Sequence, residues 1–318
     1  MGDLLERTAQ ARENLAGSAT FAMSLGAKES FHTNFLAFLL ESRDPLLSEL
    51  QKQLREVLGL PMLEGELSAC AVWRERPSLD LVAVPLLYVA NEQDGLQLAE
   101  RRCLVVEAKL KSMPTSGQLE RYLDKTPLLP YPSPDSEDTV RFKVSDDWVT
   151  RVLLTPEGVK VPNKGNRASW WVPVSWGDVR AAIITHGVPA LEEGSGLRSI
   201  LVDYAAALEQ VLAIVVATRE RMDELLAQGQ YSVIMEEVTH KNLRRLRLHD
   251  LVGKVAFDEW VGKLNSCLEE QMKVSPDADK PPALVTRYVH FSNGRPGMGL
   301  EATRGDLSLG VQVQGSQL

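Results

Sequence analysis

Apolar residues recur at helical spacing along the first part of the chain. A helix-prone segment covers residues 3–25, and phenylalanines spaced along one side predict a second helix at Glu29–Glu41. Asp44-Pro45 marks a break, after which a third helix is expected at 46–58, ending at Gly59. The chain therefore begins with a helical region.

Strand-like runs follow this region and alternate with helical ones. Strands are expected in five apolar runs, at 69–74, 79–84, 103–110, 149–154 and 170–174. Helical patterns fall between or after them, at 117–125 and 178–185. Four prolines at 127–138 predict a loop there. The first 195 residues are therefore expected to contain both helices and strands.

The remainder of the chain has a different pattern. Three helices are expected, at 199–227, 232–249 and 256–273, and a strand-like region with turns covers 283–313. We therefore place a domain boundary near residue 195. It separates a domain at 1–195 from a helical and β region at 196–318 that could recognise a substrate or form an oligomer.

Composition places the 318-residue chain among ordinary globular proteins, with 44% hydrophobic and 25% charged residues. The N-terminus lacks the apolar run of a signal peptide, and the longest apolar stretch, 211–218, is too short to span a bilayer. Cys70, Cys103 and Cys267 form no CxxC pair, which indicates reduced thiols in a cytoplasmic protein. We therefore expect a cytoplasmic location without membrane association. The net charge of −8 argues mildly against bulk attraction to nucleic acid but does not exclude a nuclease.

Charged residues interrupt the strand expected at 103–110. Glu107 and Lys109 share one face of it because side chains alternate along a strand. Glu107-Ala108-Lys109 is the only acidic-x-Lys triplet in the chain. Burial of such a pair is costly unless a partner or a metal ion is present, so the triplet is a candidate site. A structural ion pair at a strand end is the alternative.

Asp80 interrupts the preceding apolar strand close to its start. If the two strands pair in an antiparallel hairpin, Asp80 and Glu107 converge at one edge of the sheet. Two neighbouring carboxylates repel each other unless a hard cation lies between them, and Mg²⁺ or Mn²⁺ prefers such oxygen ligands. Taken alone, Asp80 is more typical of a turn cap than of a metal ligand.

Two flanking helices carry further candidates. Gln118 and Tyr122 lie one turn apart directly after the Glu107–Lys109 strand, although a polar face with a half-buried tyrosine is equally ordinary. Glu29 and His32 share one side of an upstream helix. Glu29 could add a carboxylate to the site, or it could be a first-turn acid favoured by the helix dipole. Both interpretations stay open.

The most basic run of the chain lies at 240–249. Lys241, Arg244 and Arg245 share one helical face and could contact a phosphate backbone, although solvated charged faces are common. Trp170, Trp171 and Trp176 could stack on bases, but tryptophans beside a valine-rich strand more often lie in the core.

Taken in order, these motifs resemble the PD-(D/E)XK, restriction-endonuclease-like nuclease superfamily, in particular its bacterial branch of stand-alone nuclease-like proteins. The matching segments, spread over residues 25–210, are Glu29-x-x-His32-x-Asn34, Ser78-Leu79-Asp80-Leu81, Val105-Val106-Glu107-Ala108-Lys109, Gly117-Gln118-Leu119-x-x-Tyr122, Val152-Leu153-Leu154-Thr155-Pro156, Trp171-Val172-Pro173-Val174-Ser175-Trp176 and Leu201-Val202-Asp203-Tyr204. The proline of the family motif does not directly precede Asp80, since Pro77 stands three residues before it.

The resemblance implies an α/β fold with a restriction-endonuclease-like core, in which a mixed central sheet is flanked by helices. It implies that Asp80 and Glu107 bind Mg²⁺ or Mn²⁺, with the Ala108 carbonyl and Glu29 as further ligands. Lys109 would orient or help to deprotonate the attacking water, or neutralise the pentavalent phosphorane, since the pKa of a lysine falls on burial. Gln118 would position water or phosphate, and Tyr122 and His32 would support the site.

The expected function is therefore metal-dependent hydrolysis of nucleic-acid phosphodiester bonds. DNA is the expected substrate ahead of RNA, in a bacterial restriction or phage-defence setting and with a possible homodimer. The alternative is a catalytically silent nuclease-like module that binds or regulates. A third interpretation is an unrelated α/β protein with a structural ion pair, which a structure with Asp80 far from Glu107 would establish.

Overall fold

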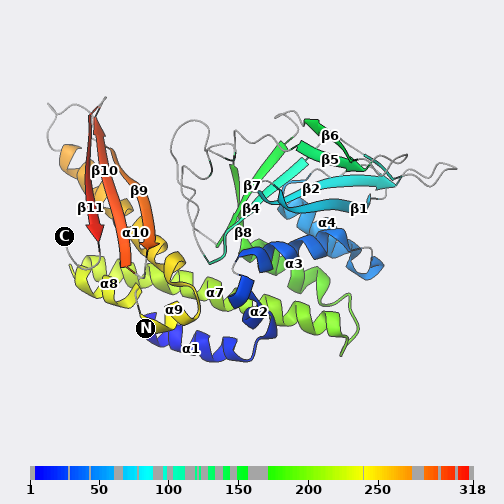
Figure 1. Cartoon of the computed structure of the whole chain (residues 1–318). Coiled ribbons are helices and arrows are strands. Elements are labelled where there is room, and N and C mark those ends of the chain that lie inside the picture. Colours follow the sequence, from blue (N-terminus) through cyan, green and yellow to red (C-terminus); the bar gives the residue numbers. More distant parts are fainter. Residues whose placement is uncertain are drawn as a thin grey trace. The chain divides into compact units, whose positions relative to one another are not determined.

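The computed structural model divides the chain into two compact units (Figure 1). One comprises residues 18–110 and 116–209, and the other comprises 1–17, 111–115 and 210–318. The structure describes residues 4–27, 29–42, 44–60, 67–76, 79–88, 96–98, 103–111, 119, 122, 128–132, 139–143, 149–156, 171–238, 240–273, 283–292, 295–304 and 307–314.

The unit at 18–110 and 116–209 contains a six-stranded mixed sheet. The strands are β1 (Leu67–Arg76), β2 (Leu79–Tyr88), β3 (Leu96–Leu98), β4 (Cys103–Ala108), β7 (Val149–Thr155) and β8 (Trp171–Ser175), in the order β1-β2-β4-β7-β8 with β3 also paired to β2. β2 runs antiparallel to both β1 and β4, whereas the pairs β4–β7 and β7–β8 are parallel. The expected mixed α/β architecture is therefore confirmed.

Helices flank this sheet. They are α2 (Ala19–Ala27), α3 (Glu29–Glu41), the short 3-10 helix η1 (Pro45–Leu47), α4 (Ser48–Val57), α6 (Trp176–Ala182) and the π-helical turn η4 (Ile183–Gly187). α3 packs against β1, β2 and β4, and α4 packs against α6 and η4. All six residues of β4 are buried, because a strand covered by structure on both faces can be apolar throughout. Glu107 therefore lies at a fully buried position of the sheet.

The expected loop at 127–138 is wrong for part of its length. Residues Leu128–Pro132 form β5, which pairs antiparallel with β6 (Thr139–Lys143) in a separate two-stranded sheet. Pro130 and Pro132 lie in β5. Proline cannot donate to a strand ladder but is tolerated on an edge strand, and a two-stranded sheet consists of edges only. The proline count therefore gave a misleading signal.

The remaining unit is built from helices and a second antiparallel sheet. Its elements are α1 (Leu4–Ala16), the second half of α7 (Gly196–Ala227), α8 (Tyr231–Val238), α9 (Lys241–Arg245), α10 (His249–Lys273), β9 (Ala283–Ser292), β10 (Arg295–Arg304) and β11 (Leu307–Gln314). The three strands follow the order β11-β10-β9, and α10 packs against β9. The expected helix at 232–249 is interrupted, since His240 caps the start of α9 and Arg247 has a positive φ of 55°.

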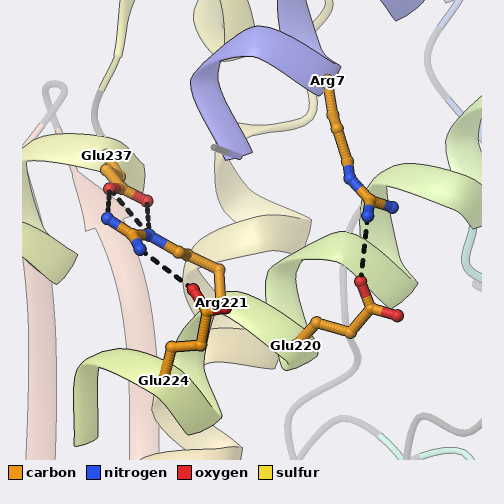
Figure 2. Close-up of polar contacts among 5 residues, drawn as sticks. All are labelled: Arg7, Glu220, Arg221, Glu224 and Glu237. Carbon is orange, nitrogen blue, oxygen red and sulfur yellow. Dashed lines mark hydrogen bonds and ion pairs between the residues drawn. The ribbon is translucent and has the colours of Figure 1, made fainter. Parts of the chain in front are cut away.

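An ion-pair network joins helices within this unit (Figure 2). The guanidinium of Arg221 on α7 donates from Nη2 to Glu237 of α8 at 2.9 Å and from Nη1 to Glu224 at 3.0 Å. Glu237 is buried, and a forked guanidinium–carboxylate contact is among the stronger ion pairs. Arg7 of α1 pairs with Glu220 of α7 at 3.2 Å on the surface. Polar contacts thus connect α1, α7 and α8.

The division between the units differs from the boundary expected near residue 195. It falls within α7, between Glu209 and Gln210, and it assigns α1 to the C-terminal unit. A turn at 189–195 precedes α7, but this helix is continuous from Gly196 to Ala227 and contributes one half to each unit. The sequence signals a break between elements, whereas the unit boundary depends on what each half of the helix contacts.

α7 also bears on the membrane expectation. By length and composition it is long and apolar enough to cross a bilayer, and half of its most apolar 18-residue window is buried within the protein. The apolar run at 211–218 is short by itself, but the helix extends well beyond it on both sides. A buried core helix passes the same test, so the cytoplasmic location stays a prediction.

Asp203 of α7 stabilises the start of α2. Its Oδ2 accepts hydrogen bonds from the Thr20 backbone N–H at 2.8 Å and from the Thr20 hydroxyl at 2.9 Å. Partial burial opposes ionisation, but these and neighbouring hydrogen bonds lower the pKa of Asp203 overall. Anions are favoured at helix N-termini, where amides lack helical partners.

We predict that Asp203→Ala lowers the free energy of unfolding by about 1 kcal/mol at neutral pH, as typical losses of helix-capping side chains do. Because the folded-state pKa lies below that of the unfolded chain, this stabilisation is present above about pH 4 and is lost as the pH falls through the folded pKa. Urea unfolding at several pH values measures it. Glu192→Ala, at an exposed turn position, is the control, and an equal loss at acidic and neutral pH would contradict the charged-cap explanation.

Candidate active site

The antiparallel pairing of β2 with β4 brings together the two strands that carry the predicted site. Leu81 lies opposite Val106 and Val82 opposite Val105, so continuing the register by one position places Asp80 opposite Glu107. The apolar partners on these strands are fully or nearly fully buried. The hairpin geometry on which the prediction depended is therefore present, and Asp80 does not lie far from Glu107.

A buried ion pair forms the centre of the site. The Lys109 ammonium lies 2.7 Å from Glu107 Oε1 and 3.7 Å from Asp80 Oδ2. The Glu107 side chain has no exposed surface, that of Lys109 is 10% exposed, and that of Asp80 is 28% exposed. The three side chains thus lead from the protein interior towards solvent.

Burial and neighbouring charges alter the acidity of both ion-pair partners. Burial raises the pKa of Glu107 to about 7; the nearby Lys109 opposes this rise and the Asp80 carboxylate adds to it. Burial alone would lower the pKa of Lys109, but the negative charges of Glu107, Asp80 and Glu29 outweigh burial and raise it. The expected net fall in the pKa of Lys109 is therefore not found, because the charges of several carboxylates around one ammonium outweigh burial.

Asp80 and Glu29 also contact the backbone on either side of Lys109. Asp80 Oδ2 accepts a hydrogen bond from the Ala108 N–H at 2.9 Å, and Glu29 Oε2 accepts one from the Leu110 N–H at 2.9 Å. Glu29 begins α3, so a helix distant in sequence reaches the end of β4. The Ala108 contact involves its amide; the contribution expected of its carbonyl stays a prediction.

His32 lies behind the site as part of a buried aromatic cluster. Its Nδ1 is 3.1 Å from the hydroxyl of Tyr204, and its ring meets that of Trp176 edge-on at 5.9 Å. Tyr204 and Trp176 are buried, and burial followed by the charge of Glu29 raises the pKa of Tyr204. These contacts favour a supporting role for His32, and the signal that finds Tyr204 is its place in the motif Leu201-Val202-Asp203-Tyr204.

The other predicted residues have different outcomes. Gln118 and Trp170 lie outside the described residues, while Tyr122 is helical and half-buried. Trp171 and Trp176 are buried core residues, as the favoured interpretation expected, and Cys70 and Cys103 are buried free thiols. Lys241, Arg244 and Arg245 are exposed in the other unit, above the buried Leu243 and Leu246.

A separate hollow of about 280 Å³ lies between α4 and the α6–η4 segment. Its lining includes Gln53, Asp178, Thr185 and His186, and it contains none of the predicted site residues. No sequence motif pointed to it.

Within the described part of the chain, no group of three or more His, Cys, Asp or Glu side chains is placed to hold a metal ion. The candidate donors are thus the two carboxylates of Asp80 and Glu107. Such a set fits Mg²⁺, which commonly binds through one or two carboxylates and retains several water ligands. The charge balance also fits, since three nearby carboxylates face one ammonium.

Comparison with known proteins gives no further assignment. No protein-family model matches the chain, and neither a curated protein nor a solved structure matches it.

We predict that Lys109→Met lowers the free energy of unfolding by about 3 kcal/mol, because breaking a buried pair leaves a carboxyl group without its cation. Glu107→Gln also destabilises, and the double variant loses less than the sum of both single losses, since neither charge then remains in the pair. Urea unfolding of the four proteins measures this coupling. Strictly additive losses would show that the 2.7 Å contact contributes nothing to stability.

Proposed function

We propose that this protein is a metal-dependent nuclease with a restriction-endonuclease-like core, which hydrolyses phosphodiester bonds of nucleic acid. The observation that carries the proposal is the Asp80–Glu107–Lys109 cluster, in which two carboxylates and an ammonium meet at the β2–β4 pairing. The mixed order of the sheet, with an antiparallel β2–β4 pair beside a parallel β4–β7 pair, supports the same superfamily assignment.

Asp80 and Glu107 would hold the divalent cation, Mg²⁺ or Mn²⁺. When bound, this cation lowers the pKa of water and neutralises charge on the phosphate. The hydrogen bond from the Ala108 amide fixes the orientation of the Asp80 carboxylate before any ligand arrives. Since a carboxylate offers about four lone-pair positions, this bond leaves acceptor capacity for a cation.

Lys109 would contact the phosphate or the attacking water. Its ammonium has three donors, and Glu107 Oε1 engages it at 2.7 Å. A lysine held in this way donates to an oxygen at which negative charge develops, and such fixed charges stabilise transition states strongly in dry sites. The Lys109 side chain is 10% exposed, whereas that of Glu107 has no exposed surface.

The substrate, setting and assembly belong to the same proposal. DNA ahead of RNA, a bacterial restriction or phage-defence setting, and a homodimer that cuts both strands are what the superfamily resemblance supports. The silent-module alternative predicts binding without cleavage, and the assay below separates the two.

Plasmid DNA, single-stranded DNA and RNA incubated with Mg²⁺, Mn²⁺ or EDTA provide the test. We expect metal-dependent cleavage by the wild type and at least a 100-fold loss in Lys109→Ala and Glu107→Gln, because each removes a group of the transition-state environment. The exposed Lys52→Ala on α4 is the matched lysine control and keeps full activity. Equal cleavage by Lys109→Ala would identify a contaminating nuclease, and absence of cleavage with retained binding would favour the silent module.

The basic turn, defined as residues Lys241, Arg244, Arg245 and Arg247, would contact the phosphate backbone. These four side chains are exposed, whereas Asn242, Leu243, Leu246 and Leu248 between them are buried, so the turn presents its cations on the solvent side. The positive φ of Arg247 reverses the chain between α9 and α10 and places a fourth cation in the turn, one that the helical-face pattern did not include.

We predict that Lys241→Ala/Arg245→Ala weakens binding to double-stranded DNA in EDTA by about tenfold at 100 mM salt. It should also reduce the slope of log K against log salt by up to about 2, since two fewer counterions are released. Fluorescence anisotropy over a salt series measures both. Lys263→Ala, another exposed lysine of this unit that pairs with Asp223, is the control. An unchanged salt slope would remove the basic turn from the interface.

A further inference from the structure

Three consecutive backbone amides around Lys109 each have an acceptor from a different part of the fold. The Ala108 N–H donates to Asp80 Oδ2 at 2.9 Å, the Lys109 N–H to the Leu154 carbonyl at 2.8 Å, and the Leu110 N–H to Glu29 Oε2 at 2.9 Å. The backbone that carries the central lysine is therefore held on both sides.

Strand geometry explains why side-chain carboxylates, rather than a neighbouring strand, accept the backbone N–H groups on the β2 side only. Successive N–H groups of a strand point to opposite sides, so those of Ala108 and Leu110 point towards β2 and that of Lys109 towards β7. The parallel pairing with β7 continues to Ala108–Leu154, whereas the β2–β4 pairing ends at Leu81–Val106. Carboxylates of Asp80 and Glu29 thus supply acceptors where the β2 ladder stops. An unmatched amide at the buried Leu110 would cost about 1–3 kcal/mol.

The position of Glu29 is fixed by the packing of α3. His32, one turn further along the same helix, contacts the buried Tyr204 and Trp176. Phe35, a further turn along, packs against Tyr204 with a ring-centroid distance of 4.1 Å and an interplanar angle of 40°. The packing of α3 therefore fixes the position of the Glu29 carboxylate relative to the end of β4.

We propose that Glu29 is a positioning residue: by accepting the Leu110 N–H, it fixes the backbone from which Lys109 projects towards Glu107 and Asp80. The inference rests on the proposed catalytic role of Lys109, and it replaces the expected role of Glu29 as a third metal ligand. No group of three acidic side chains gathers as a metal site among the described residues. Glu29 Oε2 accepts a hydrogen bond from the Leu110 amide, which follows Lys109.

Two variants of Glu29 separate hydrogen-bond reach from charge. Glu29→Gln keeps the length of the side chain and an acceptor oxygen but removes the charge. Glu29→Asp keeps the charge but is one methylene too short to reach the Leu110 N–H from the same helix position. A metal ligand tolerates neither change fully and depends on charge, whereas a backbone clamp depends on reach.

We expect Glu29→Gln to retain kcat within about threefold and Glu29→Asp to lose about 10- to 100-fold in kcat, because small displacements of a catalytic group are costly. Mn²⁺ affinity, measured by calorimetry, should change less than threefold in both. Hydrogen exchange of the Leu110 amide should accelerate at least tenfold in Glu29→Asp and stay slow in Glu29→Gln. Asn34→Ala, at an exposed position of the same helix, is the control.

Loss of Mn²⁺ affinity in Glu29→Gln would overturn the inference in favour of a ligand role, as would unchanged Leu110 exchange in Glu29→Asp. The exchange measurement does not need cleavage. If the wild type cuts no substrate, the proposed function fails, while the exchange rates still decide whether Glu29 holds the Lys109 segment. Should Glu29→Asp prove unstable, exchange and kcat in Glu29→Gln compared with Glu29→Met test the same hydrogen bond.

Discussion

The ion pair between Lys109 and Glu107 constrains the structure around it, because Glu107 lies in β4, where every residue is buried, and the buried Lys109 follows directly after this strand. Removing two charges from water costs several kcal/mol per ion, and their attraction offsets this only with good geometry and further hydrogen bonds. The 2.7 Å contact supplies the geometry. The position of β2, which carries Asp80, and of α3, which carries Glu29, then supplies additional charge and fixes the backbone of the lysine. The strand order and the packing of α3 thus place carboxylates around the buried ammonium of Lys109.

A purely structural ion pair would not require this arrangement. One carboxylate neutralises one ammonium, and well-packed apolar residues of similar volume are often at least as stable as a buried pair. Here Glu107, Asp80 and Glu29 all raise the pKa of Lys109, so three carboxylates act on one ammonium. Carboxylates held close together repel one another in the ligand-free protein, and a divalent cation between them would offset that repulsion. This imbalance is the physical argument that favours a functional site over a structural ion pair.

Much of this centre follows from sequence, for identifiable reasons. The apolar run around Glu107 predicts a buried strand, and strand alternation places Glu107 and Lys109 on one face, as their contact confirms. The role of Glu29 and the pKa of Lys109 depend on contacts between distant segments, which the local sequence pattern does not predict. The role of Glu29 depends on where the β2 ladder ends, and the pKa of Lys109 depends on how many carboxylates the fold assembles. The strand at Leu128–Pro132 was missed because local proline chemistry outweighed a pairing that only the partner strand reveals.

Asp80 makes both kinds of contact that Glu29 and Glu107 make separately, one to a backbone amide and one to the Lys109 ammonium. Like Glu29 it accepts a backbone amide, and like Glu107 it faces the Lys109 ammonium, in both cases through Oδ2. Its side chain is also the most exposed of the Asp80–Glu107–Lys109 cluster. An anchored carboxylate at the solvent side loses little entropy when a cation arrives, because its rotamer is already fixed. The hydrogen bond from the Ala108 N–H to Asp80 supplies an acceptor where the β2–β4 ladder ends. The same hydrogen bond orients the carboxylate that is the proposed metal ligand.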